Sequence, residues 1–313
     1  MNQKNAQWLQ KGGTVCLLAM ICCFLWGSAF PCVKIGYRLF SIAAEDTASQ
    51  ILFAGCRFFL AGVLTILIGS GLQRRFLFPG KACWGMVLVL SMAQTVIQYI
   101  LFYIGLAHTS GVKGSIIVAS STFFAILISS LLLHYEPLGK GKLLGCLLGF
   151  LGVVLINLSG GELSGGLSFL GEGFMLLSTL SNACSVVLMK SYSRREDPVC
   201  LSGWQFLLGG LVMILWGLLT GGRLHGISVP SILLLLYMAM ISAVAYSLWG
   251  ILLKHNSVGR VTVYGFMTPV FGVLLSAVLL QEKNQAFTVQ GLFSLILVCL
   301  GIWSVNRESS ASV

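Results

Sequence analysis

The sequence predicts an all-α integral membrane protein of ten transmembrane helices, arranged as two inverted five-helix repeats. Three observations predict this fold: an apolar composition, ten apolar segments of membrane-spanning length, and matching residues at a constant spacing in the two halves. Of the 313 residues, 57% are hydrophobic and only 9% are charged, against roughly 25% charged residues in an ordinary soluble domain. Most of the surface of such a chain must therefore face lipid.

Each apolar segment is close to the roughly 20 residues that an α-helix needs to cross a bilayer. Charged residues, Gly or Pro bound the segments. The predicted spans are residues 12–36, 48–70, 83–107, 111–134, 141–159, 168–192, 199–220, 229–254, 258–281 and 287–306. The first span follows two lysines, as a secretory signal would, but its length and the spans that follow it favour an uncleaved helix.

The basic residues are distributed unevenly between the two predicted faces of the membrane. With the N-terminus in the cytoplasm, thirteen of the 19 Lys and Arg residues lie on the cytoplasmic side, five lie outside, and Arg57 lies within a span. Because basic residues concentrate in cytoplasmic loops, we predict a multi-pass protein of the cell (inner or plasma) membrane with both termini cytoplasmic. The net charge of +10 then reflects topology and does not indicate nucleic-acid binding.

The second half of the chain repeats features of the first half. Arg57-Phe58 matches Gln205-Phe206 (205 − 57 = 148), and each pair is followed by Leu and small residues. Similar offsets match Glu136 with Glu282, His108 with His255, and Gly152 with Gly301, while Lys34 ends the first span much as Lys190 ends the sixth. We predict two related units, residues 12–159 and 168–306. Since each unit has an odd number of spans, the second begins on the opposite face, and the halves are inverted repeats.

Polar and aromatic side chains gather near the middle of spans one, three, four, six, eight and nine. A polar group at this depth is costly unless it faces the bundle interior or a wet cavity, and transporters built from inverted repeats bind their solute there. The predicted substrate-binding residues are Trp26, Ser28, Gln94, Gln98, Tyr99, Ser121, Ser178, Asn182, Tyr246, Tyr264 and Thr268. Packing is the alternative for each of them, since hydroxyls also join membrane helices and aromatic rings also fill cores.

Three basic residues have two interpretations each. Arg57 either offsets the carboxylate of a bound solute or extends toward the interface and bonds to backbone carbonyls. Lys34 and Lys190 either extend toward the headgroups or act as gates on opposite faces. Glu136 and Glu282 are expected to tie loops at the ends of spans four and nine.

Several activities find no support in the sequence. No acidic residue falls in the middle of a predicted span, whereas a pump that exchanges protons for organic cations needs a buried carboxylate. The ten Cys and four His residues have no metal-ligand spacing, and the sequence has no Walker, Rossmann, zinc-protease or nucleophile-elbow motif. We therefore predict no enzyme activity, no cofactor and no metal.

The motifs together resemble the drug/metabolite transporter superfamily, specifically its EamA-type family of ten-helix, two-repeat proteins. The resemblance rests on Leu25-Trp26-Gly27-Ser28-Ala29-Phe30, Arg57-Phe58, Glu136, Glu282, Gly171-Glu172-Gly173, Gly152–Asn157 and Gly301–Asn306. It implies a bacterial inner-membrane protein that carries amino acids and other small metabolites, often outward, through a central cavity between the halves. The sequence departs from the family at Asn182-Ala183, where Trp-Ala is usual.

We therefore expect a secondary transporter, an exporter of small neutral or zwitterionic metabolites such as amino acids, that works by alternating access. The expected partners are the small-molecule solute and the lipid bilayer. The oligomeric state is open, and a monomer is compatible with the sequence. The alternatives are a multidrug exporter of the same fold and a membrane-embedded enzyme that modifies lipids.

Overall fold

A computed structural model describes residues 7–43, 45–108, 111–158, 168–279 and 289–311. Within these ranges every regular element is a helix. The elements of the first half are α2 (Gly12–Leu39), α3 (Thr47–Gln73), η1 (Lys81–Cys83), α4 (Trp84–Leu90), η2 (Ser91–Ile97), α5 (Gln98–Ala107), α6 (Gly111–Leu127), η3 (Ile128–Leu132) and α7 (Lys140–Leu158).

The second half has a similar order of elements. They are η4 (Phe169–Gly173), α8 (Phe174–Tyr192), α9 (Pro198–Leu219), α10 (Val229–His255), α11 (Val258–Thr262), η5 (Val263–Phe266), α12 (Met267–Leu279) and α13 (Val289–Ala311). These helical stretches begin and end within a few residues of the predicted spans. Residue 159 and Glu282 lie outside the described residues.

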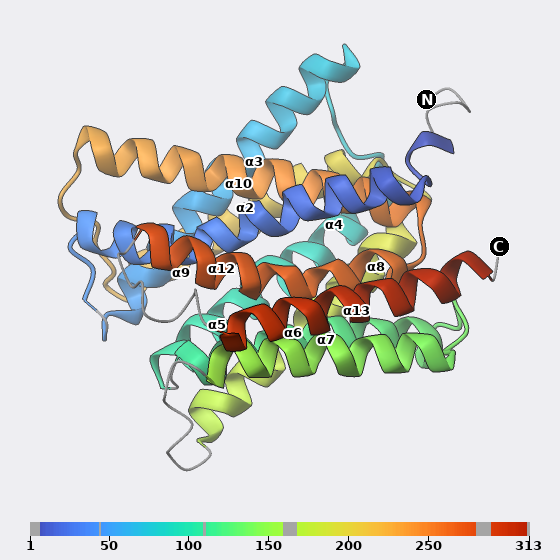
Figure 1. Cartoon of the computed structure of the whole chain (residues 1–313). Coiled ribbons are helices and arrows are strands. Elements are labelled where there is room, and N and C mark those ends of the chain that lie inside the picture. Colours follow the sequence, from blue (N-terminus) through green and yellow to red (C-terminus); the bar gives the residue numbers. More distant parts are fainter. Residues whose placement is uncertain (1–6, 44, 109–110, 159–167, 280–288, 312–313) are drawn as a thin grey trace.

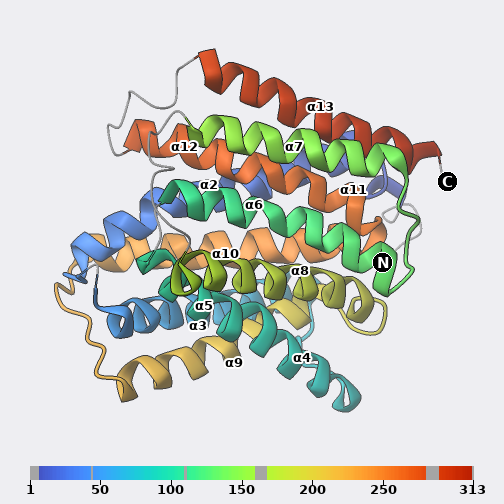
Figure 2. The same ribbon diagram turned by 90° about the horizontal axis from the view of Figure 1, so that it is seen from below.

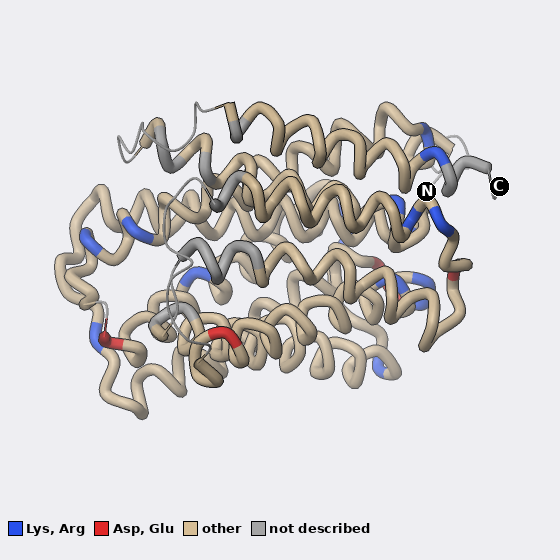
Figure 3. Tube along the Cα trace, turned by 60° about the horizontal axis from the view of Figure 1, so that its bottom comes forward, with Lys and Arg blue, Asp and Glu red and all other residues tan. Residues whose placement is uncertain are grey.

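The helices form one elongated bundle, with the two chain ends near the same end of the bundle (Figures 1 and 2). Six helical stretches of the described chain are long and apolar enough to cross a membrane, and Ile117–Leu132 and Leu292–Arg307 are shorter apolar helices. Charged residues gather toward the two ends of the bundle and leave most of its middle uncharged (Figure 3). This is an all-helical, multi-pass membrane protein.

Helices α3 and α9 occupy equivalent places in the two halves, and both begin at an aspartate N-cap. The carboxylate of Asp46 accepts a hydrogen bond from the backbone N–H of Ser49 (3.0 Å). That of Asp197 accepts from Val199 N (2.7 Å), and Pro198 fills the first helical position. Such caps satisfy N–H groups that the first turn leaves free.

Helices α3 and α9 cross at very close range, because each offers glycine to the other's backbone. A Cβ added at Gly62 would stand 2.7 Å from Leu207 Cα, and one added at Gly210 would stand 2.7 Å from Phe59 Cα. These two contacts are equivalent under the repeat spacing (210 − 62 = 148 and 207 − 59 = 148). Small residues let membrane helices approach closely, so the crossing depends on both glycines.

Helices α7 and α13 lie side by side along one side of the bundle (Figures 1 and 2), and their contact is also reciprocal. A Cβ added at Gly145 would stand 2.6 Å from Gly301 O, and one added at Gly301 would stand 2.6 Å from Gly145 O. A Cβ added at Gly152 would likewise stand too close to α13, at 2.8 Å from Ser294 O. This glycine-lined contact makes α7 and α13 a packing pair, away from the polar residues described next.

Candidate functional site

Five aromatic rings from five helices meet near the middle of the bundle. The hydroxyls of Tyr99 (α5) and Tyr246 (α10) are hydrogen-bonded at 3.0 Å. The Tyr246 ring lies 5.1 Å from Trp26 (α2) and 4.8 Å from Phe206 (α9), and the Tyr99 ring lies 4.4 Å from Phe58 (α3). Trp26, Phe58, Tyr99, Phe206 and Tyr246 are called the central aromatic cluster below.

The cluster joins equivalent residues of the two halves. Tyr99 and Tyr246 are 147 positions apart, and the stacked rings of Phe58 and Phe206, 5.4 Å apart, differ by 148 (206 − 58 = 148). A ring or hydroxyl that meets its own equivalent in this way lies at the interface between the halves.

Arg57 is buried beside this cluster. Its side chain reaches across from α3 to α10, where Nε and Nη2 both donate to Ser242 Oγ at 3.2 and 3.0 Å. The guanidinium carbon also lies 5.0 Å from the centroid of the Phe58 ring. Of the two interpretations of Arg57, the structure does not show the extension toward the interface with bonds to backbone carbonyls: among the described residues its hydrogen bonds go to a side-chain hydroxyl in the middle of α10.

Gln94 of η2 pairs with Gln205 of α9 in the equivalent arrangement. Gln205 Nε2 donates to Gln94 Oε1 at 2.6 Å, and both side chains are buried. The same offset carries Arg57 onto Gln205 (205 − 57 = 148) and Gln94 onto Ser242 (242 − 94 = 148). One buried bridge is therefore charged and its equivalent is neutral.

Helix α8 docks on the third helical stretch through hydroxyls. Ser178 Oγ donates to Gln98 O at 2.8 Å, and Ser181 Oγ donates to Ala93 O at 2.6 Å. The bond to Ala93 ends on the π-helical η2, and the bond to Gln98 ends on the first residue of α5; π-helical turns often occur at functional sites. Ser178 thus joins two helices, which is the packing role stated for it above.

Two polar atoms of the predicted site are buried without a hydrogen-bond partner among the described residues. They are the Trp26 Nε1–H donor and the Gln98 Oε1 acceptor. The Trp26 ring contacts Tyr246 in the central aromatic cluster, and Gln98 is the residue before Tyr99 at the start of α5. A buried polar group without a partner is costly, which marks these two atoms as candidates for contact with a solute.

The other predicted site residues are dispersed. Ser28 Oγ bonds to the Tyr237 hydroxyl at 3.0 Å and donates to Leu25 O. The half-buried residues Ser121, Asn182 and Thr268 make no hydrogen bond or ring contact with the cluster, as far as the described residues show.

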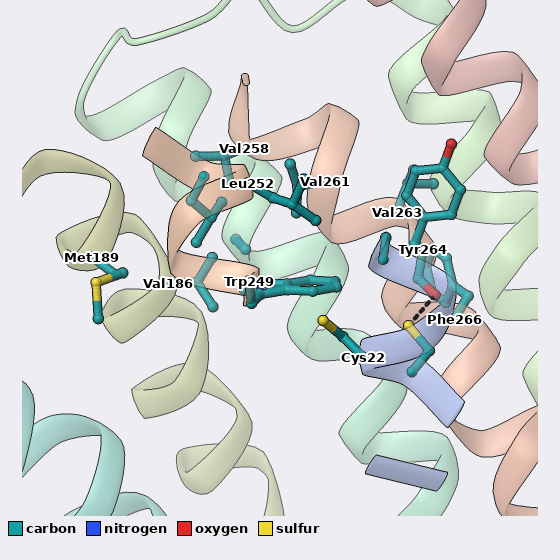
Figure 4. Close-up of a cluster of buried hydrophobic side chains, with 14 of the residues drawn as sticks. Cys22, Val186, Met189, Trp249, Leu252, Val258, Val261, Val263, Tyr264 and Phe266 are labelled. Carbon is teal, nitrogen blue, oxygen red and sulfur yellow. Dashed lines mark hydrogen bonds between the residues drawn. The ribbon is translucent and has the colours of Figure 1, made fainter. Parts of the chain in front are cut away.

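Tyr264 lies in an apolar cluster and not with the other site tyrosines. Figure 4 shows it near Phe266 and Val263, with Trp249 between Val186 and Cys22. Its position near the start of the ninth helical stretch, in η5, accounts for the difference from the sequence prediction, which placed it in the site.

Basic and acidic groups tie helices together at one end of the bundle. Lys190 is half-buried, and its Nζ donates to Asn256 O at 2.6 Å rather than reaching toward headgroups. Glu136 forms a buried ion pair with Lys142 (2.6 Å) and accepts from Gly259 N (3.0 Å). Glu136 thus ties the loop after η3 to the start of α11, as predicted, while Lys34 is exposed on α2.

Sequence reasoning missed Phe58, Phe206 and Gln205 as neighbours of the site. The repeat match of Arg57-Phe58 with Gln205-Phe206 was the available signal, because residues that recur in both halves are candidates for the interface between them. In the described residues no group of three or more His, Cys, Asp or Glu could hold a metal ion. The arrangement offers hydrogen bonds, aromatic faces and one cation, which is the chemistry of binding.

Comparison with known proteins places the chain in a family. The sequence profile of the EamA-like transporter family matches it twice, at residues 13–158 and 169–307. The chain belongs to the EamA-like transporter family. It is therefore a membrane transporter, and the family gives no support to the lipid-modifying enzyme.

Relatives and solved structures agree with this assignment. An uncharacterized transporter of Synechocystis is 29% identical over 91% of this chain and 92% of its own. A "Probable amino-acid metabolite efflux pump" of Salmonella typhimurium is 27% identical over 94% of both chains, and one of Escherichia coli is 25% identical over the same shares. A crystal structure with 15% identity has a TM-score of 0.78 over 96% of this chain and 98% of that one, which shows the shared fold.

Proposed function

We propose that this EamA-like transporter exports small neutral or zwitterionic metabolites, such as amino acids, by alternating access. The observation that carries the proposal is that equivalent residues of the two halves meet each other, as Tyr99 meets Tyr246. An interface of this kind can exist in two near-equivalent packings, one open to each side of the membrane. A solute held there is exposed to one side at a time.

The proposed topology is ten spans in two inverted repeats, residues 12–159 and 168–306. The proposed location is the cell (inner or plasma) membrane, with both termini on the cytoplasmic side. The double family match supports the two repeats, as do the reciprocal contacts of Gly62 and Gly210. The excess of Lys and Arg on one face supports the orientation.

The solute class rests on the residues available and on the relatives. The Salmonella and Escherichia relatives carry names that point to amino-acid metabolites and to efflux. The proposed binding groups are the central aromatic cluster, the two unpartnered atoms of Trp26 and Gln98, and Arg57. A small solute with both an apolar part and polar ends fits this set of groups.

A multidrug exporter of the same fold ranks lower. Organic cations need a buried carboxylate as a partner, and in the described chain the buried Glu136 is already paired with Lys142 at the end of the bundle. Aromatic faces alone attract a cation by about 0.5 to 2 kcal/mol. Resistance of expressing cells to cationic dyes separates the two functions.

Counterflow in proteoliposomes tests the proposed function. Vesicles with the purified protein are loaded with each of the 20 common amino acids in turn, and entry of the same radiolabelled amino acid is followed with and without a pH gradient. We expect at least one amino acid to exchange faster than in protein-free vesicles. If none does, and cationic dyes move instead, the proposal is wrong.

Two variants connect transport to the proposed site. Gln98→Ala should reduce exchange while the yield of folded protein stays that of the wild type, and Asn182→Ala tests whether the solute also reaches α8. Normal exchange in either variant removes that residue from the site.

A further inference from the structure

Arg57 is a buried cation with only neutral partners in the described chain. Its side chain is 4% exposed, and both of its hydrogen bonds end on one hydroxyl oxygen, Ser242 Oγ. A guanidinium has five N–H donors in a planar fork that matches a carboxylate. Two bonds to a single neutral oxygen leave most of this capacity unused.

The titratable groups that the described chain shows near Arg57 do not balance its charge. Among them are Cys32 and Tyr37 of α2, Tyr103 of α5 and Tyr246 of α10. All four are uncharged in their ordinary state. A charge at this depth is expensive and by default marks a functional site.

The polar atoms around Tyr99 and Tyr246 complete a pattern of donors and acceptors. Trp26 Nε1–H is a second buried donor and Gln98 Oε1 is a buried acceptor, and neither has a partner in the part of the chain that the structure describes. A carboxylate needs donors, whereas an ammonium group needs acceptors or aromatic faces. A solute with its carboxylate toward Arg57 and its amino group toward the aromatic faces would provide the anion that the buried guanidinium lacks.

The neutral equivalent of Arg57 supports a directional site. At the repeat-related position Gln205 is bonded to Gln94 at 2.6 Å and carries no charge. The packing of the two halves is reciprocal, but only the α3 side provides a cation. A carboxylate would therefore bind at one of the two equivalent positions, and the solute would lie in one orientation.

We propose, on the basis of the transport function above, that Arg57 binds the carboxylate of the transported solute and that Ser242 positions its guanidinium. The solutes are then carboxylates, and among them α-amino acids, while amides and alcohols of the same shape, which lack the carboxylate, are rejected. An analogue without the carboxylate leaves the buried guanidinium without an anion. A site whose buried polar group is left unpaired discriminates strongly against such an analogue.

Matched solutes test this without any variant. L-leucine, L-phenylalanine and L-threonine, each beside its carboxamide and its decarboxylated amine, compete for exchange of the fastest radiolabelled amino acid in wild-type proteoliposomes. We expect the carboxylates to inhibit at concentrations at least about tenfold lower, since a charge-assisted pair is worth more than one factor of ten. Equal inhibition by the carboxamides overturns the proposal.

Variants of Arg57 and Ser242 locate the effect. Arg57→Gln should abolish the preference for carboxylates over carboxamides, and Arg57→Lys should keep part of it, because it retains the charge but not the fork. Ser242→Ala, which remains informative if an Arg57 variant fails to fold, should weaken inhibition by the carboxylates and leave inhibition by the carboxamides unchanged. A carboxylate preference that survives in folded Arg57→Gln overturns the proposal.

The outcomes separate this proposal from the proposed function. If the wild type exchanges no amino acid, the solute class given under the proposed function is wrong. If it exchanges amino acids and their carboxamides equally well, the transport function stands and Arg57 is not the carboxylate site.

Discussion

Lys142 and Arg57 are both buried cations, but they are satisfied in different ways. Lys142 Nζ lies 2.6 Å from the carboxylate of Glu136 and also donates to Pro137 O at 2.8 Å. In the described chain, Arg57 donates hydrogen bonds to the hydroxyl of Ser242 and lies over the ring of Phe58. The charge of Lys142 is compensated within the fold, so it belongs to the structure. The charge of Arg57 is not compensated by any described group, which favours a bound solute as its counter-charge.

The largest effect on stability is expected at the compensated pair. Glu136→Gln leaves Lys142 buried without its counter-charge and should lower the free energy of unfolding by about 3 to 5 kcal/mol. Thermal unfolding of the detergent-purified protein measures this. Lys140→Gln, a substitution at a neighbouring basic residue, is the control and should change little; a small loss for Glu136→Gln would remove the distinction between the two cations.

Arg57→Gln should show the opposite behaviour. Removing an uncompensated charge relieves a desolvation penalty of several kcal/mol, so the change in stability should be smaller than about 1 kcal/mol or even favourable, while exchange of amino acids falls by at least about tenfold. Unfolding and exchange are measured on the same preparation. A loss of stability as large as that of Glu136→Gln would make Arg57 a structural residue.

Loss of the neutral hydrogen bond between Gln94 and Gln205 should lower stability by an amount between those of Glu136→Gln and Arg57→Gln. Gln205→Met removes the 2.6 Å bond to Gln94 and leaves a buried amide without its partner, which costs about 1 to 3 kcal/mol. Since no charge changes, exchange per folded molecule should stay within about twofold of the wild type. Unfolding midpoints and counterflow rates together check both parts, and unchanged stability would mean that the pair contributes nothing.

The last effect, also on stability, is expected at the N-cap carboxylate of Asp46, which lies outside the membrane-spanning part of α3. Hydrogen bonds from the side chain and backbone of Ser49 lower the pKa of Asp46, so its contribution to stability is complete above the pKa of the unfolded chain and is lost as the pH falls through the lower, folded value. Asp46→Ala should cost about 1 kcal/mol near neutral pH. The difference from the wild type should shrink when unfolding is repeated in acid; a difference that grows there would contradict the cap.

Much of the fold could be predicted because the bilayer sets the length of its helices. Apolar segments end where the helices end, and the aspartates before α3 and α9 mark their starts. The site was only partly predictable. Tyr99 and Tyr246 were selected and do meet, but the partner of Arg57 lies 185 positions away, and finding it requires the rotation and tilt of α3 against α10. The same missing rotation made Tyr264 a site residue, although it packs in an apolar cluster.

The central claim is that Arg57 serves the solute, whereas its repeat equivalent serves the fold. The most direct measurement compares Arg57→Met with Gln205→Met, at equal amounts of folded protein, for exchange of the amino acid that the wild type moves fastest. The account predicts a loss of at least about tenfold for Arg57→Met and less than about twofold for Gln205→Met. Equal rates in the two variants would contradict it.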